Sequence, residues 1–241
     1  MQRIFLGDSY KLIKAIKDNS VDLVIIDPPY EQAVRQGTGA FGVKKRLCYT
    51  QLFDISDGFN LSILDDLCRV LKKINIYIFC SKNQVIPLID YFVIERNCYW
   101  TPIRWIKDNV PPTCNNKYLN DSEYCLFFRE KGVKLYGSCD TKKTYYISHT
   151  NVIDKKKYNH PTPKPEDLIK RFVINSSKEG DLILDTFSGS GTTAVVCKRL
   201  NRRCVTFENN TKYFKSSVER LEAATAQKES ILYSQIPLIK N

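Results

Sequence analysis

The sequence predicts an α/β fold, in which a mostly parallel β-sheet carries helices on both faces. Residues 23–26 and 182–184 are continuous apolar runs, a pattern typical of strands that are buried on both sides. A glycine-rich loop joins the second run to an expected helix, which is how an open sheet builds a crevice at its strand ends. The 241 residues, 43% of them hydrophobic, suit one domain with a large core.

The remaining elements follow from the same patterns. Helices are expected where apolar residues recur three and four positions apart, and strands where short apolar runs end in turn residues. The expected strands are residues 3–6, 21–26, 75–80, 99–106, 123–129, 182–184 and 203–208, and the expected helices are residues 9–17, 61–72, 84–95, 164–174, 194–200 and 210–223. Residues 31–59 form a long loop, and a loop of that length in a compact domain is usually functional or disordered. We find no internal repeat and no linker.

The most informative turn is Asp27-Pro28-Pro29-Tyr30, directly after the first buried strand. Prolines cannot donate to a sheet, so the strand must stop at Asp27, while the proline carbonyls remain available as acceptors. Tyr30 offers a flat aromatic face beside the carboxylate. These groups together suit recognition of a planar amine. For this motif alone, the alternative is a structural turn with a packed tyrosine.

The second motif is the glycine-rich loop at residues 185–191, which contains Asp185 and Phe187. Thr192 or Thr193 is the expected N-cap of the helix that follows. The loop is neither Gly-x-Gly-x-x-Gly nor a Walker loop, and it lacks the lysine that would hold a phosphate. A phosphate cradle is therefore not expected.

An acidic residue, Glu208, ends the strand at residues 203–208. It lies roughly 20 residues beyond the glycine loop, where a dinucleotide-binding fold places the carboxylate that holds ribose hydroxyls. The alternative interpretation is a surface glutamate at a strand end.

These motifs together resemble those of the amino-group DNA methyltransferases, the S-adenosylmethionine-dependent enzymes that modify adenine N6 or cytosine N4. Their catalytic motif matches residues 27–30, their cofactor loop matches residues 185–193, and their His-Pro-Thr-x-Lys-Pro motif matches residues 160–165. The catalytic motif comes first, which is the circularly permuted order of the subgroup called beta. The resemblance covers residues 4–221 and implies a single Rossmann-like methyltransferase domain.

The resemblance also implies a division of the chain. Residues 1–109 would form the catalytic half, with a flexible loop at 31–59. Residues 110–159 would form the target-recognition segment, where basic residues alternate with tyrosines. Residues 160–241 would form the cofactor-binding half. Because the middle segment is short, target readout by loops is expected.

The catalytic residues implied are Asp27, Pro28, Pro29 and Tyr30. The lone pair of an aromatic amine is delocalised, so the amine is a poor nucleophile. Asp27 and the Pro28 carbonyl would accept its two hydrogens and aim the lone pair at the methyl group. A base in a duplex must be flipped out to reach this site, and Tyr30 would stack on it, an interaction of roughly 1–3 kcal/mol.

The cofactor implied is S-adenosyl-L-methionine. Glu208 would take its ribose hydroxyls, Asp8 its adenine amino group and Lys164 its carboxylate. An ordinary helix N-cap is the alternative role for Asp8, and His160 is expected to be structural. The residues implied in cofactor binding are Asp8, Asp27, Lys164, Asp185, Phe187, Ser188, Gly189, Gly191, Thr192, Glu208 and Asn209.

Double-stranded DNA is the implied partner, and a formal charge of +11 suits a polyanion. The basic residues expected to contact it are Lys44, Lys45, Arg46, Lys117, Lys142 and Lys143. Solvated surface charge is the alternative role for these residues. A homodimer and a cognate restriction endonuclease, as in restriction-modification systems, are left open as further partners.

Asp at the first catalytic position favours a site-specific adenine-N6 enzyme. The alternatives are an N4-cytosine DNA methyltransferase, an RNA methyltransferase, a nicotinamide oxidoreductase and a non-catalytic DNA-binding module. The intact motifs argue against the last two.

Composition excludes other classes. The nine cysteines contain no C-x-x-C pair and there are only two histidines, so no metal site is expected. No apolar stretch is long enough for a membrane span or a signal peptide. A cytoplasmic protein, prokaryotic or phage-encoded, is therefore expected.

Overall fold

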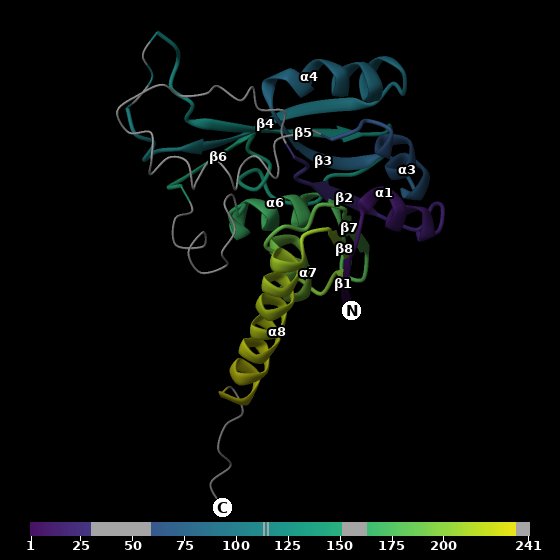
Figure 1. Cartoon of the computed structure of the whole chain (residues 1–241), viewed down its shortest axis with the longest axis vertical. Helices are drawn as coiled ribbons and strands as arrows, with labels where there is room; N and C mark the ends of the chain where they lie inside the picture. Colours follow the sequence, from purple (N-terminus) through teal and green to yellow (C-terminus); the bar gives the residue numbers. More distant parts are fainter. Residues whose placement is uncertain (30–58, 113, 115, 151–162, 235–241) are drawn as a thin grey trace, which may run out of the picture.

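The computed structural model describes residues 1–29, 59–112, 114, 116–150 and 163–234, with the side chains of 225–234 left aside. The described chain forms an eight-stranded sheet in the order β1-β8-β7-β2-β3-β5-β4-β6 (Figure 1). Only β5 runs antiparallel to its neighbours among these strands, so the predicted mostly parallel sheet is confirmed. The strands are β1 Gln2–Leu6, β2 Leu23–Ile26, β3 Asn75–Cys80, β4 Tyr99–Lys107, β5 Ser122–Arg129, β6 Tyr145–Ser148, β7 Leu182–Asp185 and β8 Arg203–Glu208.

Helices cover both faces of the sheet, as predicted (Figure 1). One face carries α1 Ser9–Leu12, the 3-10 helix η1 Ile13–Ala15, α3 Ile63–Val70 and α4 Lys82–Ile89, which continues as the π-helix η2 Asp90–Ile94. The other face carries α6 Glu166–Ser176 and α7 Thr192–Arg199. The last helix, α8 Thr211–Ser234, packs against α7 and β1 and then extends away from the body.

Alternate residues of β2 belong to different cores. Val24 and Ile26 pack with α3 and α4, whereas Leu23 and Ile25 pack with α6 and α7. All four side chains are buried. The continuous apolar run therefore has the cause that the sequence indicated, a strand covered on both sides.

Several elements differ from the sequence-based expectation. The helix expected at 9–17 is a single α-turn followed by η1, and the helix expected at 210–223 continues to Ser234. Gly191, in a left-handed conformation, caps α7 in place of Thr192 or Thr193. The strand β6 was not expected. Its four residues alternate between exposed and half-buried, so their pattern lacks the apolar run of a central strand, and pairing with β4 defines them.

The topology creates a crevice beside β2. From β2 the chain passes to β3 on one side, whereas β7 on its other side is followed by β8, farther out. At such a switch point the loops leave in opposite directions and open a space at the carboxyl ends of the strands. Asp27 follows β2, Asp185 ends β7 and Glu208 ends β8, so three carboxylates face this space from neighbouring strands.

In the core between the sheet and α6 and α7, two stacked aromatic rings offer a test of the packing. Phe172 of α6 is 2% exposed and stacks on Tyr77 of β3, with ring centroids 4.2 Å apart and planes 8° apart. We expect Phe172→Ala to lower the free energy of unfolding by about 3–5 kcal/mol, because it leaves a cavity in a dry core. Denaturant unfolding measures this change. Ile94→Ala, at a position 73% exposed, is the control, and a loss below about 1 kcal/mol in Phe172→Ala would contradict the packing.

Candidate active site

The strand ends surround a cleft of about 710 Å³, a size that suits a small ligand. Its wall is formed by the ends of β2, β3, β7 and β8 and by the start of β5. Among the residues predicted from the sequence, the cleft is lined by Asp27, Pro28, Pro29, Lys164, Asp185, Phe187, Ser188, Gly189, Thr192, Glu208 and Asn209. The structure thus brings the catalytic turn and the glycine loop together.

The Asp-Pro-Pro turn is held by the start of α4. The Gln84 side chain is buried and donates from Nε2 to the Pro29 carbonyl at 3.3 Å. Its Oε1 accepts from the Ser81 backbone N–H at 2.8 Å, as part of a capping box. Sequence reasoning missed Gln84, although Ser followed three residues later by Gln is a recognisable helix start. Tyr30 lies outside the described residues.

Lys164 pairs with the candidate catalytic carboxylate. Its Nζ lies 2.5 Å from Asp27 Oδ2 and 3.3 Å from Glu123 Oε2, and its side chain is 6% exposed. Burial lowers the pKa of Lys164, but Asp27 and Glu123 outweigh burial, so the pKa is raised and the ammonium is stabilised. In this structure Lys164 contacts Asp27, and its predicted contact with the cofactor carboxylate stays a prediction.

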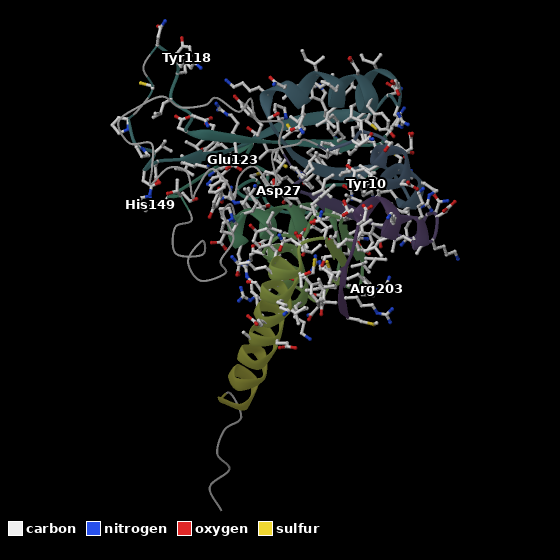
Figure 2. The ribbon with its side chains drawn as sticks, in the orientation of Figure 1. Tyr10, Asp27, Tyr118, Glu123, His149 and Arg203 are labelled. Atoms are coloured by element: carbon white, nitrogen blue, oxygen red, sulfur yellow. The ribbon has the colours of Figure 1, made fainter. Side chains whose placement is uncertain are left out.

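Glu123 was not predicted as a site residue. It begins the predicted strand at residues 123–129, and a single acid there carries no motif. In the structure its Oε1 lies 2.5 Å from Lys107 Nζ, and Figure 2 shows it in the middle of the molecule with Asp27. Burial raises the pKa of Glu123, but Lys164 and Lys107 outweigh burial, so the pKa is lowered.

The glycine loop wraps around the two other carboxylates. Phe187 N–H donates to Asp185 Oδ1 at 3.0 Å, and Gly189 N–H donates to Glu208 Oε2 at 2.7 Å. Gly191 has a φ of +76°, and a Cβ there would lie 2.8 Å from the Ser217 Cβ. The loop therefore depends on glycine for both conformation and close approach to α8.

The carboxylates have perturbed titration because the cleft is desolvated. Burial raises the pKa of Asp185 to about 7, although Thr193 and the Phe187 N–H act against burial. Burial also raises the pKa of Glu208, against hydrogen bonds from the backbone N–H groups of Asn210 and Gly189. These oxygens retain acceptor capacity toward the cleft.

Arg220 stabilises the glycine loop by hydrogen bonds. Its guanidinium is buried and donates to the Ser190 carbonyl at 3.0 Å, to Thr192 Oγ1 at 3.0 Å and to Glu166 Oε1 at 2.8 Å. This residue of α8 was missed because an arginine in a helix carries no sequence signal for such a contact.

Asp8 is the N-cap of α1, the structural role that was given as the alternative to cofactor binding. Its carboxylate accepts from the Tyr10 N–H at 2.9 Å and caps α1. Ser9 and Tyr10 line the cleft, whereas Asp8 does not. Gly191, which is buried, is also not among the residues that line the cleft. A contact of Asp8 with a cofactor stays a prediction.

The predicted DNA-contacting residues lie away from the cleft or outside the described chain. Lys44, Lys45, Arg46 and His160 fall outside the described residues. Lys117, Lys142 and Lys143 are exposed, and Lys143 pairs with Asp140 at 2.8 Å. Tyr118, beside Lys117, is fully exposed at the tip of a loop that Figure 2 shows far from Asp27.

Two absences hold for the described part of the chain. It contains no group of three or more His, Cys, Asp or Glu side chains placed to hold a metal ion. None of its helices combines the length and the apolar character that a membrane crossing requires.

Comparison with known proteins gives consistent matches. A family model described as DNA methylase matches residues 21–219. The type II methyltransferase M.HpaI of Haemophilus parainfluenzae is 29% identical over 246 residues, which cover 92% of this chain and 74% of that protein. The DNA adenine methyltransferase YhdJ of Escherichia coli (strain K12) is 27% identical over 252 residues, covering 92% and 83%.

Solved structures match the fold. The M1.HpyAVI–SAM complex superimposes with a TM-score of 0.65 at 24% identity, covering 92% of this chain and 99% of that one. The PvuII DNA methyltransferase, described as cytosine-N4-specific, gives 0.67 at 19% identity, covering 96% and 93%. The predicted Rossmann-like methyltransferase fold is confirmed.

The raised pKa of Asp185 predicts a pH dependence of stability. A carboxyl whose pKa is about 7 when folded and 3.8 when unfolded stabilises the folded state below about pH 4. That contribution is lost as the pH rises toward 7, to an upper limit of ~4 kcal/mol. We therefore expect the unfolding free energy of the wild type, minus that of Asp185→Asn, to fall between about pH 4 and 7.

Urea unfolding across this pH range measures the difference, and Asp65→Asn is the reference for loss of a carboxylate outside the cleft. A difference that does not change with pH would contradict the desolvation of Asp185.

Proposed function

The chain belongs to the DNA methylase family, and from that premise we propose that it methylates the exocyclic N6 of a flipped adenine in double-stranded DNA, using S-adenosyl-L-methionine. The observation that carries the proposal is one cleft lined by both the Asp-Pro-Pro turn and the glycine loop at residues 185–191. The turn would handle the target amine and the loop the methyl donor.

The turn supplies hydrogen-bond acceptors for the amine. Asp27 and the Pro28 carbonyl would each accept one amino hydrogen, which directs the nitrogen lone pair toward the donor. S-adenosylmethionine, when bound, supplies an electrophilic methyl group on a sulfonium sulfur. Attack by the amine nitrogen would form the nitrogen–carbon bond and break the carbon–sulfur bond, whose electron pair would stay on sulfur. The methylated nitrogen would then be acidic, and the Asp27 carboxylate would accept its proton through their hydrogen bond.

The glycine loop and Glu208 fit the donor chemically. Backbone at Gly189 approaches the cleft without a side chain, and a Cβ at Gly191 would force the loop away from α8. The carboxylates of Asp185 and Glu208 suit the cationic sulfonium, the amino group and the ribose hydroxyls of the donor. Phe187, whose ring meets Phe59 edge to face at 6.3 Å, adds an apolar wall.

Adenine is favoured over cytosine by two observations. One relative is named a DNA adenine methyltransferase, and the first catalytic position here is Asp. The fold does not discriminate, because a cytosine-N4-specific enzyme shares it.

DNA contact is proposed for the exposed lysines of residues 110–159. Among its described residues this segment contributes β5 and β6 to the sheet, and the described residues within 110–121 and 130–144 lie outside these two strands. Lys117, Lys142 and Lys143 would contact phosphates.

Relatives named type II methyltransferases support a cognate restriction endonuclease as a functional partner, and their bacterial sources support action in a bacterial cytoplasm.

Methyl transfer can be measured directly. Incubation with radiolabelled S-adenosylmethionine and unmethylated genomic DNA, followed by nucleoside digestion and mass spectrometry, should give N6-methyladenine. Asp27→Ala should retain cofactor binding by calorimetry but lose at least about 100-fold in turnover, because the amine loses its acceptor. Asp65→Asn, outside the cleft, is the control. Turnover retained in Asp27→Ala, or N4-methylcytosine as product, would refute the corresponding assignment.

DNA binding is tested by salt dependence. Lys142→Ala should weaken binding to every sequence alike and reduce the slope of log K against log salt by about 0.9, as expected for one lost phosphate contact. Lys14→Ala makes the same charge change on η1, on the opposite side of the molecule from β6 (Figure 1). An altered sequence preference with an unchanged slope would exclude the phosphate role.

A further inference from the structure

Glu123 is a largely buried carboxylate in the cleft wall that the proposed chemistry does not use. Its side chain is 16% exposed, and it lies on β5 opposite Trp105 of β4. A buried carboxylate costs free energy unless charged or polar groups compensate it. Glu123 is compensated by two lysines, Lys107 and Lys164, and Lys164 also pairs with Asp27 of the catalytic turn.

Four charged groups alternate in sign along the wall of the cleft. Lys107 lies 2.5 Å from Glu123, Glu123 lies 3.3 Å from Lys164, and Lys164 lies 2.5 Å from Asp27. They come from four parts of the chain, namely the end of β4, the start of β5, the segment before α6 and the residue after β2. The cluster is neutral as a whole, and only tertiary structure assembles it.

Lys164 is held from several sides. Its ammonium contacts both carboxylates and lies 4.8 Å from the centre of the Phe79 ring, while its own carbonyl accepts from Thr192 Oγ1 at 3.4 Å. A lysine side chain has a flexible four-carbon stem. Without the Glu123 carboxylate, the ammonium would be less constrained in position and less strongly stabilised in its charged form.

We propose that Glu123 is a positioning residue for methyl transfer, which holds the Lys164 ammonium at Asp27 Oδ2 so that the carboxylate stays anionic and correctly oriented toward the target amine. The proposal rests on the acceptor role proposed for Asp27. Glu123 acts through Lys164 and is not itself required to touch the base or the methyl donor.

The alternative is a purely structural link between β4 and β5 through Lys107. The two roles differ in what loss of the Glu123 charge does to methyl transfer. Among the described residues, the titratable groups that act on the Lys164 ammonium include Asp27, Glu123 and the Cys125 thiol, whose pKa burial raises well above its usual value and which is therefore neutral. Loss of the Glu123 charge removes a carboxylate that stabilises the ammonium, so the pKa of Lys164 should fall in either role. A purely structural link predicts that kcat and its pH profile stay unchanged.

The first measurement needs neither DNA nor cofactor. Lysine ε-carbons are labelled with ¹³C, the Lys164 resonance is assigned by its absence in Lys164→Met, and the protein is titrated from neutral pH to beyond the ordinary lysine range, because the pKa of Lys164 is raised. Glu123→Gln, which keeps shape but removes charge, should titrate at lower pH than the wild type. An unchanged Lys164 titration overturns the proposal, whether or not the protein methylates DNA.

The second measurement is kinetic. Glu123→Gln should lose about 10-fold or more in kcat, with cofactor Kd within about threefold of the wild type and an alkaline limb of the pH–rate profile shifted to lower pH. Glu123→Asp, which keeps the charge on a shorter stem, should recover part of the loss. Asp65→Asn is the control for an ion pair outside the cleft. A kcat and pH profile equal to wild type in Glu123→Gln would refute the positioning role.

Two controls keep the outcomes separate. A wild-type protein that transfers no methyl group to DNA refutes the proposed function and leaves the lysine titration as the test of Glu123. If Glu123→Gln does not fold, Glu123→Asp should still give a smaller downward shift of the Lys164 titration, and no shift in that variant overturns the proposal.

Discussion

Three carboxylates end or follow three neighbouring parallel strands, and the cleft depends on holding these largely buried groups in place. Each is compensated differently. Asp27 has the Lys164 ammonium, Asp185 has the Phe187 N–H, and Glu208 has the N–H groups of Gly189 and Asn210. A buried charge without such partners would be neutralised or would destabilise the fold. The loops around the cleft are arranged so that their donors reach these oxygens.

Residues distant in sequence hold those loops. Gln84 at the start of α4 supports the Pro29 carbonyl, and Arg220 in α8 supports the glycine loop and pairs with Glu166 in α6. Each contact links the cleft to a helix that covers one face of the sheet. Site geometry is therefore coupled to packing of the whole domain, which is the usual requirement for a preorganised catalytic centre.

The charge pattern of the cleft agrees with methyl transfer from a cationic donor to a neutral amine. Asp185 and Glu208 supply negative or polar oxygen near the glycine loop, whereas the Lys107–Glu123–Lys164–Asp27 cluster, which also lines the cleft, is balanced in charge. The same fold serves a cytosine-N4-specific enzyme, so base choice lies in details of the wall and not in the architecture.

The sequence by itself determined the fold class, the family and the main cleft residues. Continuous apolar runs indicate strands buried on both faces, and short motifs such as Asp27-Pro28-Pro29 keep their meaning because their geometry is local. Tertiary structure alone decided the rest. Glu123 and Arg220 are single polar residues with no local pattern that identifies their contacts, the contact of Gln84 with Pro29 lies outside its local helix-start pattern, and the partner of Lys164 lies 137 residues away in the chain. Strand β6 likewise forms only because the fold brings it beside β4. Such long-range contacts depend on where the sheet brings distant segments of the chain together.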